Sequence, residues 1–355
     1  MSTMVKAFAR NFSDSRDRFL AAADKAGAVL TTYAHPLRGP GDEPLACDIA
    51  RLGASDPEML LVLITGVHGV EHYPGSASVC DWLERSAVEG LPDGMGAVVI
   101  HAINPWGAAW CRRYTEDNVD LARNFLDFDA PRPTHPPYQE VEPLLRHMEG
   151  HEAQEVIQKL FARLGEREAI DALMSGQYEY PDGFSFGGHV ATWSRETVEG
   201  ILADQVGSAK RVCLVEFHSG LGPWGEVMPV SMQTGSDLDR ARCYYGENII
   251  APRVEKGSHG APGHTTDGYL QLLGEREVSS IVLEYGTYPP SESLPVLLAD
   301  HWVHANGKAL TEFGRKIASE NLEMHCPSDA AWQSEVIEKG TAFIAASIRG
   351  LQQCH

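Results

Sequence analysis

MLLVLITGVHGVEH, residues 59–72, places three polar side chains directly after an apolar run. Residues 59–67 are apolar and rich in branched side chains, as in a strand that is covered on both faces of a sheet. His68, Glu71 and His72 follow at once, and all three side chain types can bind a metal ion. Because ligands of open α/β sheets bind beyond the carboxyl ends of the strands, this stretch predicts such a sheet with a site at its edge.

Three further segments have the same buried-strand pattern, and helical patterns alternate with them. The strands are predicted at residues 96–104, 211–219 and 279–287, and the helices at residues 76–88 and 293–313. The alternation predicts an α/β fold with a central mixed, mostly parallel sheet and helices on both faces.

The rest of the chain predicts one domain with an insertion. Residues 27–37 and 45–53 flank a turn-rich segment and predict a β-hairpin. Residues 126–200 contain a Pro-rich entry, two helical stretches and a Gly-rich loop, with no flexible linker at either end and little apolar content. We therefore expect a single catalytic domain over residues 1–355, with residues 126–200 inserted into it.

The composition excludes some classes of partner. The formal net charge is -20, with 49 acidic residues against 29 Lys and Arg, so we expect binding neither to nucleic acid nor to an anionic membrane surface. No apolar run is long enough to span a bilayer, and the mixed apolar and charged residues 1–27 predict a surface helix rather than a signal peptide. Seven widely spaced cysteines favour reduced thiols and a cytoplasmic protein.

His68 and Glu71 form a candidate metal site with His218, which ends the predicted strand 211–219. Two ligands from one short segment and a third from far along the chain are typical of a catalytic zinc, whose fourth position stays open for water. The competing interpretation is that these histidines are only hydrogen-bonded at a loop. Taken singly, each histidine favours that interpretation, but the joint pattern favours zinc.

Charged residues near the other strand ends extend the candidate site. Glu284 ends an apolar strand, where a carboxylate is costly unless it is paired or catalytic, and it is the candidate general base. Arg113 and Arg123 are candidates to stabilise an oxyanion and to bind a substrate carboxylate, or else are ordinary ion-paired residues. Asp120 is a candidate acceptor for the second N–H of a ligand imidazole.

The motifs, in this order, resemble the zinc metallocarboxypeptidase family in the broad sense that includes succinylglutamate desuccinylase and aspartoacylase. The resemblance rests on H68-G-V-E71, N104-P, R113-Y-T-E-D-N-V-D120-L-A-R123-N124-F, F217-H218-S and L283-E284-Y, and it is closest to a poorly characterised branch. It implies one Zn²⁺ per chain on His68, Glu71 and His218, with Glu284 as general base. It also implies that Arg113 polarises the scissile carbonyl, that Arg123 binds a substrate carboxylate, and that the sheet has about eight strands.

The chain departs from the family's pattern at the substrate-binding positions. Ala122 stands where members commonly have Asn, so an amide that would share the substrate carboxylate with Arg123 is missing. Asn124 is the adjacent candidate, and Tyr269 is the candidate for the family's mobile substrate tyrosine. Glu216 replaces the Asp that is frequent two residues before the third ligand.

Three functions compete on these residues. The leading hypothesis is a zinc-dependent amide hydrolase, a carboxypeptidase or N-acyl amino acid deacylase, in which Glu284 assists attack by metal-bound water on a short peptide or N-acyl amino acid. The alternative is a zinc-binding protein of this fold that has lost catalysis. A nucleotide site at Gly220–Gly225, which fits G-x-G-x-x-G, is disfavoured because the residues that follow predict a strand rather than a helix.

Two other histidine motifs have simpler interpretations. His72 is expected at the rim of the site, because a catalytic metal needs one position free. His301 and His304 lie one helical turn apart and predict a surface or interface role. The oligomeric state does not follow from the sequence.

Overall fold

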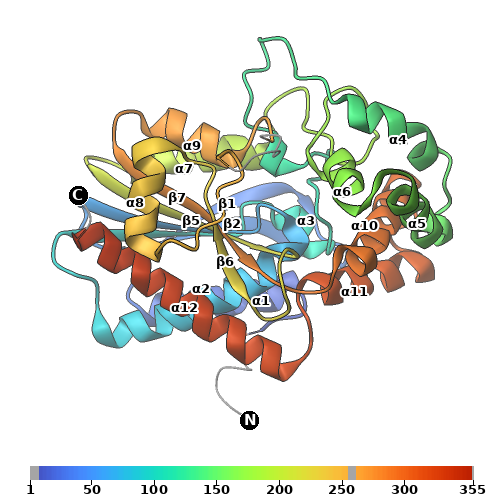
Figure 1. Ribbon diagram of the computed structural model, residues 1–355. Coiled ribbons are helices and arrows are strands. Elements are labelled where there is room, and N and C mark those ends of the chain that lie inside the picture. The colour runs from blue at the N-terminus through green and yellow to red at the C-terminus, as the bar shows by residue number, and fades with distance from the viewer. Residues whose placement is uncertain (1–7, 255–260, 354–355) are drawn as a thin grey trace.

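The computed structural model describes residues 8–254 and 261–353. Its seven strands form one sheet in the order β1-β2-β4-β3-β5-β7-β6, which the helices surround (Figure 1). The strands are β1 (Val29–Arg38), β2 (Pro44–Gly53), β3 (Met59–Thr65), β4 (Met95–His101), β5 (Arg211–Ser219), β6 (Val227–Val230) and β7 (Glu277–Tyr285). The helices are α1 (Phe12–Lys25), α2 (His72–Glu89), α3 (Pro105–Ala109), α4 (Pro136–Arg146), α5 (Ala153–Leu164), α6 (Glu166–Met174), α7 (Trp193–Gln205), α8 (Gly235–Tyr245), α9 (Thr265–Leu273), α10 (Pro290–Ala305), α11 (Glu312–His325) and α12 (Ala330–Gln353).

The centre of the sheet is parallel and its edges are antiparallel. Strands β4, β3, β5 and β7 run parallel, whereas β1, β2 and β6 pair antiparallel. The expected hairpin (β1 and β2), the buried strands and the mixed sheet are therefore confirmed, with seven strands among the described residues instead of about eight. The parallel strands end at one edge, which brings the residues after β3, β5 and β7 together.

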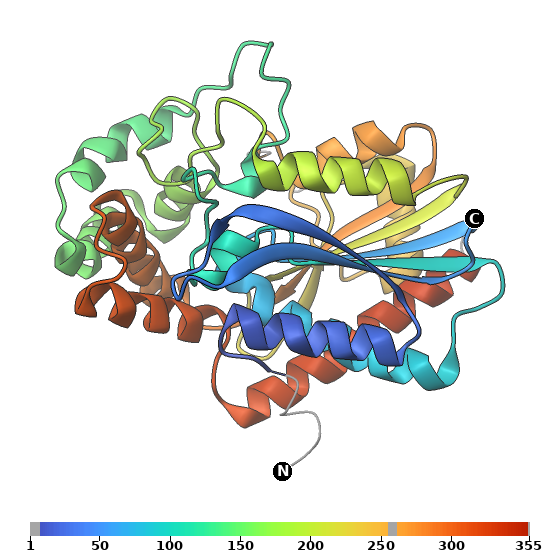
Figure 2. The same cartoon turned by 180° about the vertical axis from the view of Figure 1, so that it is seen from behind.

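Helices cover both faces of the sheet and explain why its central strands are apolar throughout. Helices α1, α2 and α12 cover one face and α7 and α9 the other, as the view from behind shows (Figure 2). Successive side chains of a strand point to opposite faces. Leu61 and Leu63 accordingly join the core under α2 and α12, while Leu60 and Val62 join the core under α7 and α9.

Residues 126–192 of the predicted insertion pack beside the sheet rather than on it, whereas residues 193–200 begin α7, which covers one face. Figure 1 shows α4, α5 and α6 gathered with α10 and α11 at one side. Their apolar side chains form a cluster that Leu294, Leu297 and Leu298 of α10 complete. The segment, which has little apolar content of its own, therefore shares its hydrophobic core with α10 of the rest of the domain.

The helix predicted over residues 293–313 is wrong in its extent. Helix α10 ends at Ala305, and α11 begins only at Glu312. Gly307 has φ +63°, a left-handed conformation that ends a helix, and the side chain of Thr311 caps the next helix by accepting from the Gly314 N–H.

The cysteines depart in part from the expectation of reduced thiols. Cys47, Cys80, Cys111, Cys213 and Cys326 are free, but Cys243 takes part in a disulfide, and Cys354 lies outside the described residues. Among the described helices, none has the length and apolar character needed to cross a membrane.

A buried polar cluster joins α1 to the start of α2. Ser15 Oγ lies 2.9 Å from His72 Nε2 and 2.9 Å from Ser76 Oγ, which in turn lies 2.8 Å from His101 Nε2. Both rings are fully buried, so the expectation that His72 lies at a rim is wrong. Burial lowers the pKa of His101 to about 3, and the ring stacks on Phe19 in its neutral form.

The buried, neutral His101 predicts a loss of stability in mild acid. Below about pH 6.5 the unfolded chain takes up a proton at this residue that the folded chain refuses until about pH 3, so the free energy of unfolding falls by about 1.4 kcal/mol per pH unit in that window. The free energy of unfolding, measured in urea at pH 7.5 and at pH 5.5, should therefore decrease between the two pH values by about 1.4 kcal/mol less in His101→Gln than in the unmodified chain. The exposed His151→Gln is the control, and equal losses in all three proteins would contradict the argument.

Candidate metal centre

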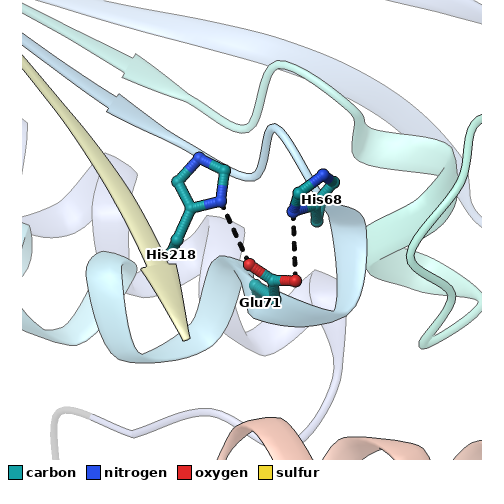
Figure 3. A group of neighbouring side chains, drawn as sticks. All are labelled: His68, Glu71 and His218. Carbon is teal, nitrogen blue, oxygen red and sulfur yellow. Dashed lines mark ion pairs between the residues drawn. The ribbon is translucent and has the colours of Figure 1, made fainter. Parts of the chain in front are cut away.

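The ends of β3 and β5 bring His68, Glu71 and His218 to one point. His68 Nδ1 lies 3.0 Å from one Glu71 oxygen, and His218 Nδ1 lies 3.1 Å from the other (Figure 3). One possible ligand atom from each residue lies within 4.8 Å of the others, and all three residues are buried. The structure thus brings together the three residues that the sequence predicted as ligands.

Local backbone geometry explains how a strand end can present two of these ligands. Gly66 has φ +77° and turns the chain after β3, and the short 3₁₀ helix η2 (Gly69–Glu71) follows. A Cβ on Gly69 would lie 2.1 Å from the main-chain carbonyl carbon of Gly107, so only glycine fits there. Main-chain bonds from Gly69 N to Arg113 O and from Val70 N to Arg112 O hold the turn.

Asp120 orients the ring of His68. The His68 Nε2 lies 3.0 Å from Asp120 Oδ1, which directs Nδ1 of the same ring toward Glu71. Burial acts to raise the pKa of Asp120, but the neighbouring Arg113 and His68 outweigh it and hold that pKa well below its usual range. Metal-bound histidines usually give their second N–H to such a carboxylate.

His218 lies between two carboxylates. Its Nδ1 faces Glu71, and its Nε2 lies 3.6 Å from Glu216, which also accepts a hydrogen bond from the Thr265 hydroxyl at 2.8 Å. Burial acts to lower the pKa of His218, yet Glu216 and Glu71 raise it to about 10. The Glu216 carboxylate therefore flanks the ring of His218 as a charged neighbour but makes no hydrogen bond to it.

Arg113 supplies the positive charge beside the acids. It donates to Glu71 from Nη1 at 2.6 Å and approaches Asp120 from Nε and Nη2 at 3.4 Å. Glu71 also accepts from the Ser219 N–H at 3.2 Å. Glu71 is thus satisfied by protein donors, so hydrogen bonding alone explains part of the arrangement.

The donor set nevertheless fits a zinc ion. Two imidazole nitrogens and a carboxylate oxygen are the ligands of a catalytic zinc with an open fourth position. The Nδ1 atoms of His68 and His218 both face the Glu71 carboxylate, at 3.0 and 3.1 Å, so the possible ligand atoms of all three residues point to one position. The cysteines described as free contribute no ligand to the cluster of His68, Glu71 and His218.

Glu284 lies beside the cluster on the neighbouring strand. It pairs in register with His218 across β5 and β7, so both side chains point to the same face. The residue is only 7% exposed, and one of its carboxylate oxygens is buried without a hydrogen-bond partner. Burial raises the pKa of Glu284 to about 7, although His218 and Arg113 oppose this.

The three candidate substrate residues lie differently from what we expected. Arg123 donates to the main-chain carbonyls of Ala122, Met174 and Ser175. The amide of Asn124 is fully buried and holds the loop at residues 187–192 through three main-chain bonds. Tyr269 is fully buried in the core against Phe125. In this arrangement Asn124 and Tyr269 are structural residues with no surface for a substrate.

Two histidines that the sequence does not assign to the site flank the cluster: sequence reasoning missed His325, and it places His264 only in a turn-rich loop that either borders the cleft or is exposed to solvent. His325 of α11 is buried, and burial lowers its pKa while Glu71 opposes this. His264 caps α9, and burial lowers its pKa to about 3 although Glu216 lies nearby. Neither residue stands at a strand end or in a ligand-like spacing, so no pattern in the sequence marks it.

His301 and His304 also differ from their expected surface role. Both are largely covered: His304 packs against Trp106 and Trp110, and His301 against Tyr114 and Phe184. They line a cavity of about 700 Å³ between α10 and the segment 126–200, which none of the three candidate ligands lines. We therefore base the functional site on the strand ends rather than on this cavity.

The glycine-rich segment after β5 leads into a strand, as the sequence predicted. Residues 220–225 turn the chain, and β6 follows instead of a helix. Without a helix N-terminus the segment offers no dipole for a pyrophosphate. The fold therefore does not support a nucleotide site at this segment.

Comparison with known protein families assigns the chain to one of them. A family model described as "Protein of unknown function (DUF2817)" matches residues 8–339. The chain belongs to this family. All of the candidate ligands and Glu284 lie within the part of this DUF2817 chain that the model matches. A search of curated proteins found no match.

Several solved structures are similar to this DUF2817 chain. A metallo-carboxypeptidase from Burkholderia cenocepacia has a TM-score of 0.47 and 13% identity, over 96% of this chain and 69% of that one. The murein-tripeptide amidase MpaA from Escherichia coli O157 has a TM-score of 0.39 and 14% identity, over 78% and 93%. The succinylglutamate desuccinylase from Chromobacterium violaceum has a TM-score of 0.39 and 15% identity, over 83% and 73%. They are the kinds of protein that the sequence motifs resemble, and at these values we draw no conclusion about activity from them.

The geometry predicts that one zinc binds through His68 and His218. Metal analysis of the purified protein should give about one equivalent, and His68→Ala or His218→Ala should lose it because two ligands hold a catalytic zinc poorly. Asp120→Asn should weaken zinc affinity by roughly 10–100-fold, since the ring of His68 loses its acceptor. The exposed His147→Ala serves as control, and full metal content in both ligand variants would show the assignment to be wrong.

The bonds of Arg123 predict a structural effect of its removal. Arg123→Gln leaves three main-chain carbonyls without their donor, and we expect the free energy of unfolding to fall by about 2 kcal/mol. The exposed Lys316→Gln should change it by less than about 0.5 kcal/mol. Unchanged stability of Arg123→Gln in urea unfolding, together with lost substrate binding, would restore the expected carboxylate-binding role.

Proposed function

We propose that the protein is a zinc-dependent hydrolase that cleaves an amide bond in a short peptide or an N-acyl amino acid. One observation carries the proposal: possible ligand atoms of the buried residues His68, Glu71 and His218 converge to within 4.8 Å of one another at the strand ends, with Glu284 beside them. The resemblance of the motifs to zinc carboxypeptidases and desuccinylases supports the same chemistry.

Each residue has a role that follows from its place. Zinc, when bound, polarises a carbonyl group and lowers the pKa of water. Glu284 takes a proton from the attacking water and passes it to the leaving nitrogen, and its poorly solvated carboxylate suits proton transfer near neutral pH. Arg113 lies buried beside the ligands and stabilises the negative charge that builds on the carbonyl oxygen.

The substrate class follows from what the site lacks. The usual pairing of an amide with an arginine for a terminal carboxylate is missing at Ala122, and the guanidinium of Arg123 is bonded to main-chain carbonyls. We therefore propose that recognition relies on groups other than this pair. We also propose that the chain is a single catalytic domain and that residues 126–200 are an insertion that borders the substrate site. The protein is proposed to be cytoplasmic.

A second candidate is a zinc-binding protein without catalysis. The bonded state of Arg123 and the alanine at position 122 favour it, because both remove substrate contacts of the family's pattern. The buried Glu284 speaks for catalysis, since a carboxylate with an unpartnered oxygen beside a metal site costs stability without serving the fold.

Replacement of Glu284 decides between the two candidates. Zinc-loaded protein should hydrolyse members of a panel of short peptides and N-acyl amino acids, with the released amine measured by mass spectrometry. Glu284→Gln keeps the shape of the side chain but cannot accept the proton, so turnover should fall at least about 100-fold while zinc content stays at one equivalent. The exposed Glu292→Gln is the matched control. Absence of turnover in the zinc-loaded parent with both substrate classes would leave the non-catalytic candidate.

A further inference from the structure

Two loops form a rigid rim next to Glu284. Residues 220–226 follow β5, which carries His218, and residues 286–288 follow β7, which carries Glu284. Main-chain bonds join them: Gly220 N to Tyr285 O at 3.0 Å, Gly225 N to Gly286 O at 3.1 Å, and Gly286 N to Glu226 O at 2.8 Å. The rim is therefore fixed to the same two strands that place the candidate metal ligand and general base.

Glycines make this close contact between the loops possible. Gly220 and Gly222 have φ +128° and +106°, which other residues rarely adopt. A Cβ on Gly286 would lie 1.9 Å from the carbonyl oxygen of Pro223. The G-x-G-x-x-G pattern thus serves to lay one loop tightly on the other.

The rim presents apolar side chains to solvent. Leu221 is 54% exposed and Trp224 is 44% exposed. Trp224 packs edge-on against Tyr288 with ring centroids 5.0 Å apart, and below it lies the buried Trp332, whose Nε1 donates to Gly286 O at 2.8 Å. Side chains held in this way are an ordered apolar surface rather than a flexible one, and its exposure to water is unfavourable.

The loop that carries this apolar surface lies beside the candidate catalytic centre. Gly220 N bonds to the carbonyl oxygen of Tyr285, the residue after Glu284, and a Cβ on Gly222 would lie 2.3 Å from Cε of Met228, which pairs with Glu284 across β6 and β7. A substrate whose scissile amide reaches Glu284 therefore has its neighbouring groups next to Leu221, with Trp224 three residues further along the same loop. Among occupants of an apolar surface, the substrate itself is the one that this position favours.

We propose that Leu221 and Trp224 form a subsite for an apolar group of the substrate, an acyl chain or an aromatic side chain. The inference rests on the proposed function and narrows its substrate class to amides that carry such a group next to the scissile bond. An apolar contact of this kind also compensates for the missing carboxylate-binding pair at Ala122 and Arg123.

The test measures binding without turnover. Zinc-loaded Glu284→Gln is titrated by calorimetry with N-acetyl-, N-butyryl-, N-hexanoyl- and N-octanoylglycine. We expect affinity to rise about twofold per methylene, half of the effect of complete burial, because the rim stays partly open to water. Adding Trp224→Ala and Leu221→Ala should remove most of this dependence on chain length, and adding the distant, exposed Val88→Ala should leave it intact.

The outcomes separate the subsite from the catalytic proposal. A flat series, or no binding of any member, overturns the subsite even when the parent protein hydrolyses other amides. A graded series that depends on Trp224 and Leu221, with no hydrolysis by the parent protein, supports the subsite and overturns only the proposed catalysis. If the rim substitutions leave the series unchanged but shift the molecular mass measured by light scattering, the surface joins two copies of the chain and the proposal is wrong.

Discussion

The shared carboxylate of Glu71 is the interaction on which the site depends. The Glu71 carboxylate contacts His68 of its own turn, His218 at the end of β5 and Arg113 of the segment after α3. Three stretches that are far apart in the sequence meet there because β3 and β5 are adjacent and parallel. The sheet order, more than any single loop, therefore determines that a metal-binding geometry forms.

Burying so many charges requires that each has a partner. Asp120 and Glu71 share Arg113, while Glu216 and Glu71 flank His218, so positive and negative groups alternate through the cluster. Removal of one member of such a cluster leaves another charge buried and unpaired, which costs more than the lost contact itself. Glu284 differs from Glu71, Asp120 and Glu216 because burial raises its pKa to about 7, whereas neighbouring positive groups lower the pKa values of the other three, and this distinction supports its proposed role in proton transfer.

The strands and the ligand set could be predicted from sequence, whereas side-chain direction and burial could not. Continuous apolar runs mark β3, β4, β5 and β7, and polar residues at their ends mark His68, Glu71 and His218. The prediction that His72 lies at a rim failed because Ser15 of α1, 57 residues away, forms its surroundings. Arg123 and Asn124 match a motif, but they donate to main-chain carbonyls of the segment 126–200, at the end of α6 and in the loop that contains Gly187. Such long-range partners leave no periodic pattern in the chain.

A crystal structure of the zinc-loaded protein, with anomalous scattering measured at the zinc edge, tests the central claim most directly. The account predicts one strong peak about 2.1 Å from the Nδ1 atoms of both His68 and His218, with an oxygen of Glu71 completing the protein ligands. A peak elsewhere, for example beside His301 and His304, or two imidazoles that share no peak, would contradict it.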